Sequence, residues 1–89
     1  MNLPYIQSEI FRELVGMETL LKPEYRFTIY RSFTKIIMFV DLWDSEEEQI
    51  IPTHYINTHA IKTTADITAE INRIWDAIPD ECKKDNILK

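Results

Sequence analysis

The first part of the chain repeats apolar side chains at spacings of three and four residues, which places them on one face of a helix. These apolar positions are Ile6, Ile10, Leu14, Met17 and Leu21. We therefore predict an amphipathic helix over residues 3–21, with Asn2 as the N-cap and Pro4 in the first turn. Gly16 either costs about 1 kcal/mol inside a continuous helix or marks a break in it. Pro23 ends the segment in both cases.

From residue 25 the pattern changes from helical to alternating. Residues 25–30 alternate between two faces and predict a strand. Residues 36–43 are apolar on both faces except for Asp41, which is typical of a strand at the centre of a sheet. Residues 49–57 predict a third strand. Because Pro52 cannot donate a hydrogen bond to a neighbouring strand, we expect this one to be an edge strand or a bulged one.

A second helix is predicted from the clearest helical stripe in the chain. The stripe consists of Ile67, Ile71, Ile74 and Ile78. Thr63 followed by Asp66 is typical of a capping box at a helix start, and Pro79 ends the helix. Trp75 lies beside the stripe at helical spacing, so we expect it in the core. The charged residues 80–89 are expected to form a frayed tail.

The predicted order is helix, three strands, helix, in a single domain spanning residues 1–89. The short connections 31–35 and 44–48 favour an antiparallel meander. We therefore predict an α+β fold, a three-stranded antiparallel meander with an N-terminal and a C-terminal helix packed on one face (α-β-β-β-α). The second face then has nothing to cover its apolar side chains, which are drawn from Tyr30, Ile37, Phe39, Trp43 and Tyr55. Exposed apolar patches larger than a few hundred Å² usually mark interfaces.

Composition narrows the function classes. The 89 residues include one glycine, Gly16, so the sequence contains no glycine-rich phosphate-binding loop, and enzymes that depend on such a loop are excluded. Cys82 is the only cysteine, and residues 1–5 lack the pattern of a secretory leader, so we expect a reducing, cytoplasmic location. The longest apolar run, Ile36–Val40, is too short to span a membrane. Fourteen isoleucines against two valines suggest an AT-rich gene, as in many phages and plasmids; a phage-borne protein would work in the host cytoplasm.

Charge is concentrated in one region. The chain carries 15 acidic and 10 basic residues, for a formal net charge of −5. Five of the carboxylates fall between residues 41 and 48, namely Asp41, Asp44, Glu46, Glu47 and Glu48. A run of this kind is either a solvated hairpin tip that keeps a sheet edge soluble or a contact for a basic partner surface. Trp43 immediately precedes it, where an aromatic side chain can serve equally as core or as an interface anchor.

No catalytic, cofactor-binding or metal-binding set can be assembled. His54 and His59 lack the further ligands that a zinc site requires, and Cys82 follows the acidic residues Asp80 and Glu81 with no histidine nearby in sequence. We therefore expect a protein that is not an enzyme and needs no cofactor. Basic residues beside tyrosines suggest a nucleic-acid surface, formed by Lys22, Arg26, Arg31 and Lys35 with Tyr25 and Tyr30. Glu24 lies within this cluster, and the net negative charge of the chain opposes phosphate binding.

The pattern as a whole favours a small acidic protein that binds another macromolecule. We expect an inhibitor or immunity-type protein, phage- or plasmid-borne, that blocks a basic surface of a partner enzyme such as a nuclease or a defence protein. The expected partner-binding residues are Phe39, Trp43, Asp44, Glu46, Glu47, Glu48 and Tyr55. Two alternatives remain open: a homodimeric structural or chaperone-type protein, and a nucleic-acid-binding regulator that uses Arg26, Tyr30, Arg31 and Lys35. A membrane partner is not expected.

Overall fold

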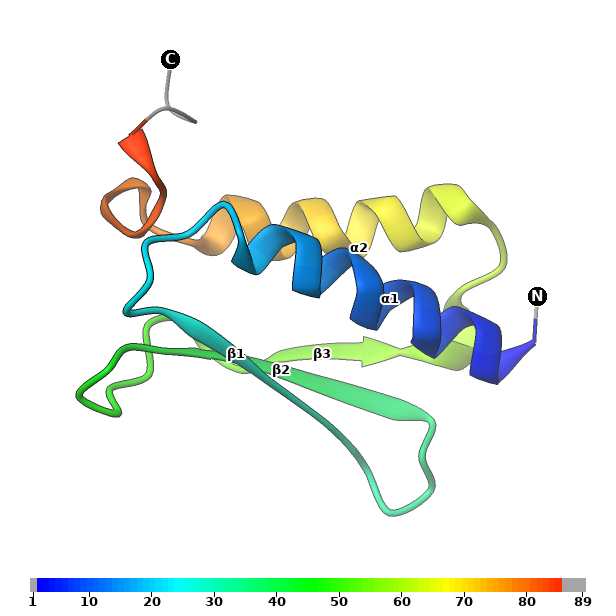
Figure 1. The fold of residues 1–89 in the computed structure, drawn as a ribbon. Coiled ribbons are helices and arrows are strands. Elements are labelled where there is room, and N and C mark those ends of the chain that lie inside the picture. Colours follow the sequence, from blue (N-terminus) through cyan, green and yellow to red (C-terminus); the bar gives the residue numbers. More distant parts are fainter. Residues whose placement is uncertain (1, 86–89) are drawn as a thin grey trace.

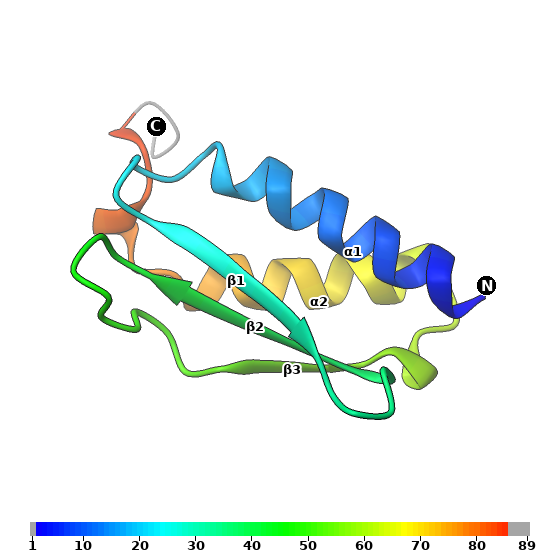
Figure 2. The ribbon, with the colours of Figure 1, turned by 60° about the horizontal axis from the view of Figure 1, so that its bottom comes forward.

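The computed structural model describes residues 2–85 and confirms the α+β architecture. Its elements in chain order are α1 (Leu3–Glu18), β1 (Arg26–Arg31), β2 (Ile37–Trp43), β3 (His54–Asn57), the short 3-10 helix η1 (Thr58–Ala60), α2 (Thr64–Ala77) and the 3-10 helix η2 (Asp80–Cys82). The three strands form one antiparallel sheet in the order β1-β2-β3. Both helices lie on the same side of this sheet (Figures 1 and 2), so its other side is left uncovered.

Helix α1 begins as the sequence predicts. The Asn2 side chain accepts a hydrogen bond from the Tyr5 backbone N–H at 2.9 Å, and a proline occupies the first turn. The helix continues through Gly16, because Met17 in the following position is buried in the core. It ends at Glu18, three residues earlier than predicted, where the Thr19 N–H and hydroxyl both donate to the Gly16 carbonyl.

Strand β2 lies at the centre of the sheet, as its apolar pattern predicts. Its register pairs Ile29 with Val40 on one side and Tyr55 with Phe39 on the other. The third strand is shorter than predicted: residues 49–53 contribute one isolated bridge, and regular pairing starts only at His54. Pro52 has no N–H to donate, and residues 49–53 carry side-chain hydrogen bonds in place of a regular ladder.

The two connections without glycine place other residues in the left-handed region of the backbone. Lys35, between β1 and β2, has a φ of 64°, and Glu47, between β2 and β3, has a φ of 62°. This conformation costs a residue with a side chain about 1–2 kcal/mol. The surrounding hydrogen bonds hold both residues in place; for example, the Lys35 N–H donates to the Ser32 carbonyl at 2.8 Å.

Helix α2 begins with the predicted capping box. The Asp66 carboxylate accepts the backbone N–H groups of Lys62 and Thr63 at 2.8 and 3.0 Å, and these hydrogen bonds lower the pKa of Asp66. The Thr63 hydroxyl accepts the Asp66 N–H in return. Side chains of both helices meet those of the sheet in one core, whose largest fully buried members are Ile10, Leu14, Leu21, Leu42, Ile56 and Ile74.

The segment that follows α2 is docked, whereas the sequence predicted fraying from residue 80. The Cys82 carbonyl accepts the Lys22 N–H at 2.9 Å, and the Lys84 N–H donates to the Leu20 carbonyl at 3.0 Å. Cys82 and Lys83 are buried, and the Lys83 ammonium lies 4.3 Å from the centre of the Trp75 ring. The expectation of a frayed tail therefore does not hold over residues 80–84, and its last part, 86–89, lies outside the described residues.

Candidate functional site on the uncovered sheet face

The uncovered side of the sheet presents the alternate residues of each strand. On β2 the buried residues Met38, Val40 and Leu42 point towards the helices. The intervening residues of β2 and the cross-strand neighbours in register with them therefore lie on the other side. We call this side the open face; its residues are Arg26, Thr28, Tyr30, Ile37, Phe39, Asp41, Trp43, Tyr55 and Asn57.

Three aromatic side chains, one from each strand, meet at the centre of the open face. The rings of Tyr30 and Phe39 are stacked with their centres 4.9 Å apart, and the ring of Tyr55 meets Phe39 edge-on at 5.2 Å. Tyr30 is 43% exposed and Tyr55 is 65% exposed. We call these residues the aromatic trio. Two of the predicted partner-binding residues, Phe39 and Tyr55, are thus in direct contact on a surface that the fold leaves open to solvent.

Trp43 lies at the end of the open face next to the connection between β2 and β3. It pairs in register with Arg26, and the two residues line a hollow of about 280 Å³ together with Thr28 and Glu47. We call this the Trp43 hollow. The hollow therefore brings together two of the expected partner-binding residues, Trp43 at the end of β2 and Glu47 in the turn that follows it.

The acidic turn, residues 44–48, is built around Asp44. One Asp44 carboxylate oxygen accepts the backbone N–H groups of Glu46 and Glu48, each at 2.9 Å. The Asp44 N–H donates to the Glu48 carbonyl, and the Glu47 N–H donates to the Asp44 carbonyl. Asp44 therefore shapes the turn, whereas the side chains of Glu46, Glu47 and Glu48 are exposed. The four acidic residues of the predicted contact set therefore divide into one that builds the turn and three that present charge.

Asp41 has a role that the sequence did not reveal. It is only 5% exposed although it lies on the open face, because the connection after the acidic turn folds over it. The Asp41 carboxylate accepts hydrogen bonds from the Thr53 hydroxyl at 2.5 Å and from the Gln49 amide at 3.2 Å. Partial burial and a hydrogen bond with Asp41 raise the pKa of Tyr30. Asp41 thus ties the connection between β2 and β3 to the edge of the aromatic trio.

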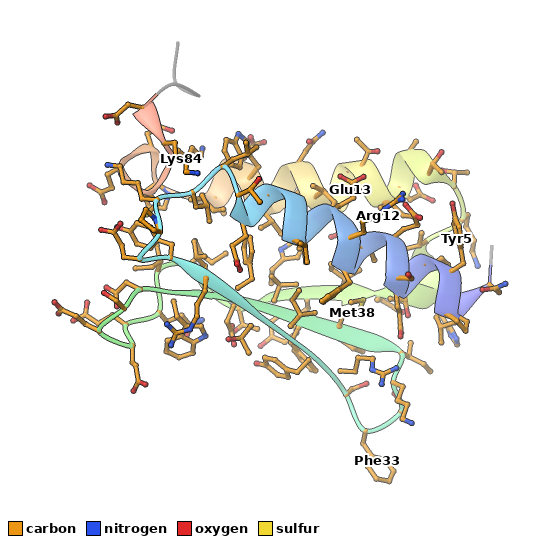
Figure 3. All side chains as sticks on the ribbon, in the orientation of Figure 1. Tyr5, Arg12, Glu13, Phe33, Met38 and Lys84 are labelled. Atoms are coloured by element: carbon orange, nitrogen blue, oxygen red, sulfur yellow. The ribbon has the colours of Figure 1, made fainter. Side chains whose placement is uncertain are left out.

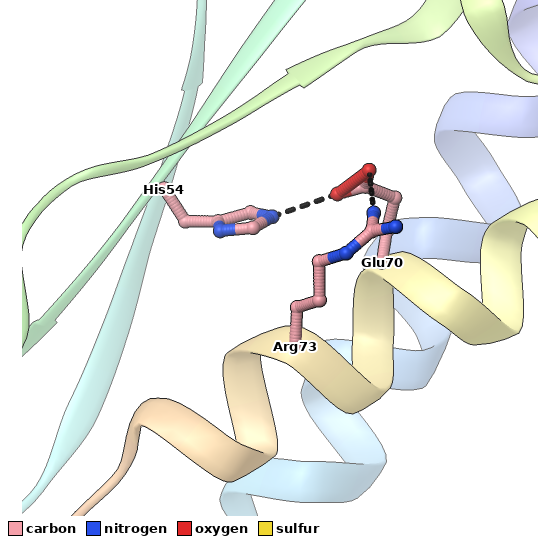
Figure 4. A network of polar contacts seen from close by, with 3 residues as sticks. All are labelled: His54, Glu70 and Arg73. Atoms are coloured by element: carbon pink, nitrogen blue, oxygen red, sulfur yellow. Dashed lines mark hydrogen bonds and ion pairs between the residues drawn. The ribbon is translucent and has the colours of Figure 1, made fainter.

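The two histidines do not come together. His54 lies on the helix side of β3, and its Nε2 atom lies 2.8 Å from a carboxylate oxygen of Glu70 on α2 (Figure 4). The other oxygen of Glu70 accepts a hydrogen bond from Arg73 at 2.6 Å. This network links the short strand β3 to α2. Within residues 2–85, no group of three or more histidine, cysteine or acidic side chains could hold a metal ion.

Cys82 lies in a buried environment at the other end of the molecule from the hairpin between β1 and β2. Burial raises the pKa of its thiol. A hydrogen bond with Cys82 raises the pKa of the neighbouring Tyr25 to about 12. Both side chains therefore keep their protons at neutral pH, which is the opposite of what a thiolate nucleophile requires.

The basic cluster considered for nucleic-acid binding is dispersed in the structure. Arg26 and Arg31 stand at opposite ends of β1 and on opposite faces of the sheet. Arg31 donates to the Gln7 side chain of α1 at 3.3 Å, so it lies on the helix side. Lys22 lies in the connection before β1, against the docked segment. Among residues 2–85, no continuous basic surface lies beside Tyr30.

Phe33 is an exposed residue that the sequence interpretation passed over. It is fully exposed at the tip of the hairpin between β1 and β2, and it points away from the body of the protein (Figure 3). The signal was present in the sequence, since a phenylalanine inside a polar hairpin connection has no place in the core. The sequence also places Tyr30 on the uncovered face, although the expected contact residues do not include it.

Within the described part of the chain, no helix has both the length and the apolar character needed to cross a membrane. Comparison of the chain with protein-family models, with curated proteins and with solved structures found no match.

Proposed function

We propose that this chain is a small acidic binding protein that covers a basic surface of a partner protein, in the manner of an inhibitor or an immunity protein. The observation that carries the proposal is the aromatic trio: three contacting rings on a sheet face that no helix or strand of the described fold covers. Aromatic side chains bury 150–250 Å² each and are enriched at the centres of protein interfaces. Burial against a partner would remove this apolar surface from water.

The acidic turn supplies the charge complementarity. Glu46, Glu47 and Glu48 project from a turn whose backbone is held by the Asp44 carboxylate, so little backbone entropy is lost when they face a partner. Charges at the edge of an apolar contact mainly accelerate association and exclude wrong partners. The aromatic trio and Trp43 would then contribute to the lifetime of the complex, and the glutamates to its rate of formation.

Basic protein surfaces are commonly the channels along which nucleic acids bind. A protein that places an acidic turn and an apolar face on such a channel blocks it sterically, without any reaction. We therefore propose a nuclease or a defence enzyme as the partner class, and a phage or plasmid gene as the source of the inhibitor. The isoleucine-rich, glycine-poor composition supports that source.

The proposal is tested with two variants of equal net charge. In the turn variant, Glu46, Glu47 and Glu48 are replaced by glutamine. In the control variant, the same number of charges is removed elsewhere, by changing the exposed residues Glu13 and Glu24 to glutamine and Asp76 to asparagine. Proteins retained by the immobilised wild-type chain are identified, and their association with each purified variant is measured at low and at high salt.

We expect the turn variant to associate on the order of tenfold more slowly than wild type at low salt, and this difference to shrink at high salt. The control variant should lose much less, because its charges lie outside the proposed contact. Equal association rates for the turn variant and wild type would contradict the proposal. Steeply salt-dependent binding to single-stranded nucleic acid would favour the regulator alternative instead.

A further inference from the structure

The hairpin tip between β1 and β2 presents a fully exposed phenylalanine on a rigid support. Phe33 buries none of its side chain within this fold. The tip beneath it is held by hydrogen bonds from Lys35 N–H to the Ser32 carbonyl, from Ser32 N–H to the Ile37 carbonyl, and from the Gln7 side chain to the Lys35 carbonyl. Phe33 therefore stands out from a fixed turn, and docking it would cost little ordering of the backbone.

The two ends of the sheet carry opposite charge. The hairpin tip carries Arg31 and Lys35, both exposed, and no acidic residue occurs between Tyr25 and Val40. At the other end of β2 lie the Trp43 hollow and the three exposed glutamates of the acidic turn. A strand of seven residues separates the two ends by about 20 Å, so the tip cannot reach the hollow of its own chain.

The Trp43 hollow is an open depression with room for a single aromatic side chain. Its volume of about 280 Å³ lies just below the usual range of pockets for small-molecule ligands. Trp43 offers a ring against which an aromatic side chain can pack, and the guanidinium of Arg26, its cross-strand neighbour, can lie over the face of an incoming ring. Glu47, which also lines the hollow, would face a positively charged side chain next to the inserted ring.

We propose that Phe33 of one copy of this chain inserts into the Trp43 hollow of a second copy, with Arg31 and Lys35 of the first facing the glutamates of the second. When two copies share a single contact of this kind, the pair leaves one tip and one hollow unoccupied, and the assembly can extend. Because the buried area is small, we expect a dissociation constant on the order of millimolar, increasing with salt. This self-association goes beyond the proposed function, although it occupies the same acidic turn and would compete with a partner there.

The experiment is sedimentation velocity on the full chain from roughly 10 μM to 1 mM, at low and at high salt. We expect the weight-average sedimentation coefficient of wild type to rise with concentration past the value for a dimer. Phe33→Ala should remain monomeric with an unchanged melting temperature, because the side chain is fully exposed. Trp43→Ala, and Glu47→Lys as a second variant that leaves the half-buried tryptophan in place, should also remain monomeric.

A mixing test shows whether the contact joins the tip of one copy to the hollow of another. Phe33→Ala keeps its hollow and Glu47→Lys keeps its tip, so an equimolar mixture should form heterodimers that grow no further. Three results would overturn the inference: a wild type that stays monomeric at the highest concentration in low salt, a Phe33→Ala that associates like wild type, or a mixture that stays monomeric. None of these results bears on the proposed function, because that proposal is tested by how fast a different protein associates with wild type and with the turn variant.

Discussion

Replacing Asp41 by alanine removes the group that ties the connection between β2 and β3 to the sheet. In wild type, the Asp41 carboxylate accepts hydrogen bonds from the Thr53 hydroxyl and the Gln49 amide in a nearly buried position. A hydrogen bond to a charged group contributes about 1.5–3 kcal/mol, and a donor left without an acceptor adds a desolvation cost. Because Gln49 and Thr53 can turn partly to water, we expect a total loss of about 2–3 kcal/mol in the free energy of unfolding.

Chemical denaturation of wild type and Asp41→Ala measures that loss directly. For a domain of this size it corresponds to a fall in melting temperature of roughly 10–20 °C. Asp41→Asn serves as the matched control, since its amide oxygen still accepts a hydrogen bond and it should lose less than alanine. A double-mutant cycle with Thr53→Ala should give a coupling energy of at least about 1 kcal/mol. A loss for Asp41→Ala within about 0.5 kcal/mol, the range of an ordinary surface substitution, would refute the reasoning.

Three further predictions concern the backbone and the helix caps. Gly16→Ala should raise the free energy of unfolding, measured by chemical denaturation, by about 0.5–1 kcal/mol, because alanine favours the helix and an added Cβ meets nothing within 4 Å. A lower free energy of unfolding in this variant would contradict the prediction. Lys35→Gly should also raise the free energy of unfolding, by about 0.5 kcal/mol. Glycine relieves the strain of the left-handed backbone conformation, and this gain is larger than the cost of the greater conformational entropy that glycine gives the unfolded chain. The pKa of Asp66 is lower in the folded state than its ordinary value of 3.8, so the stability it contributes is complete above that value and is lost as the pH falls further. Unfolding measured between about pH 5 and pH 2 should show a shallower loss in Asp66→Asn, and an unchanged slope would contradict the assigned cause.

The elements that the sequence predicted well are those governed by local rules. The N-cap at Asn2, the capping box of α2 and the apolar stripes depend on neighbours within one or two helical turns. The central position of β2 followed from its two apolar faces. Those rules determined the order and type of the elements, and from them followed an open sheet face that carries Phe39 and Tyr55.

The features that the sequence missed depend on contacts between distant segments. The third strand begins late because Gln49 and Thr53 use their side chains on Asp41 in place of backbone pairing. The segment after α2 is ordered because its backbone pairs with residues 20–22, more than fifty positions away in sequence. Periodicity carries no information about either pairing. The same limit hid the structural role of Asp44, which in sequence looks like one more exposed carboxylate.

The central claim is that the open face is the surface a partner covers, and oxidative footprinting of the complex tests it most directly. Tyr30 and Tyr55 on the open face are 43% and 65% exposed, and Tyr5 and Phe11 on α1 provide matched controls at 47% and 48%. In the complex with a protein retained by the wild-type chain, we predict that oxidation of Tyr30 and Tyr55 falls several-fold while that of Tyr5 and Phe11 is unchanged. Protection of the α1 aromatics with full oxidation of the open-face tyrosines would contradict the claim.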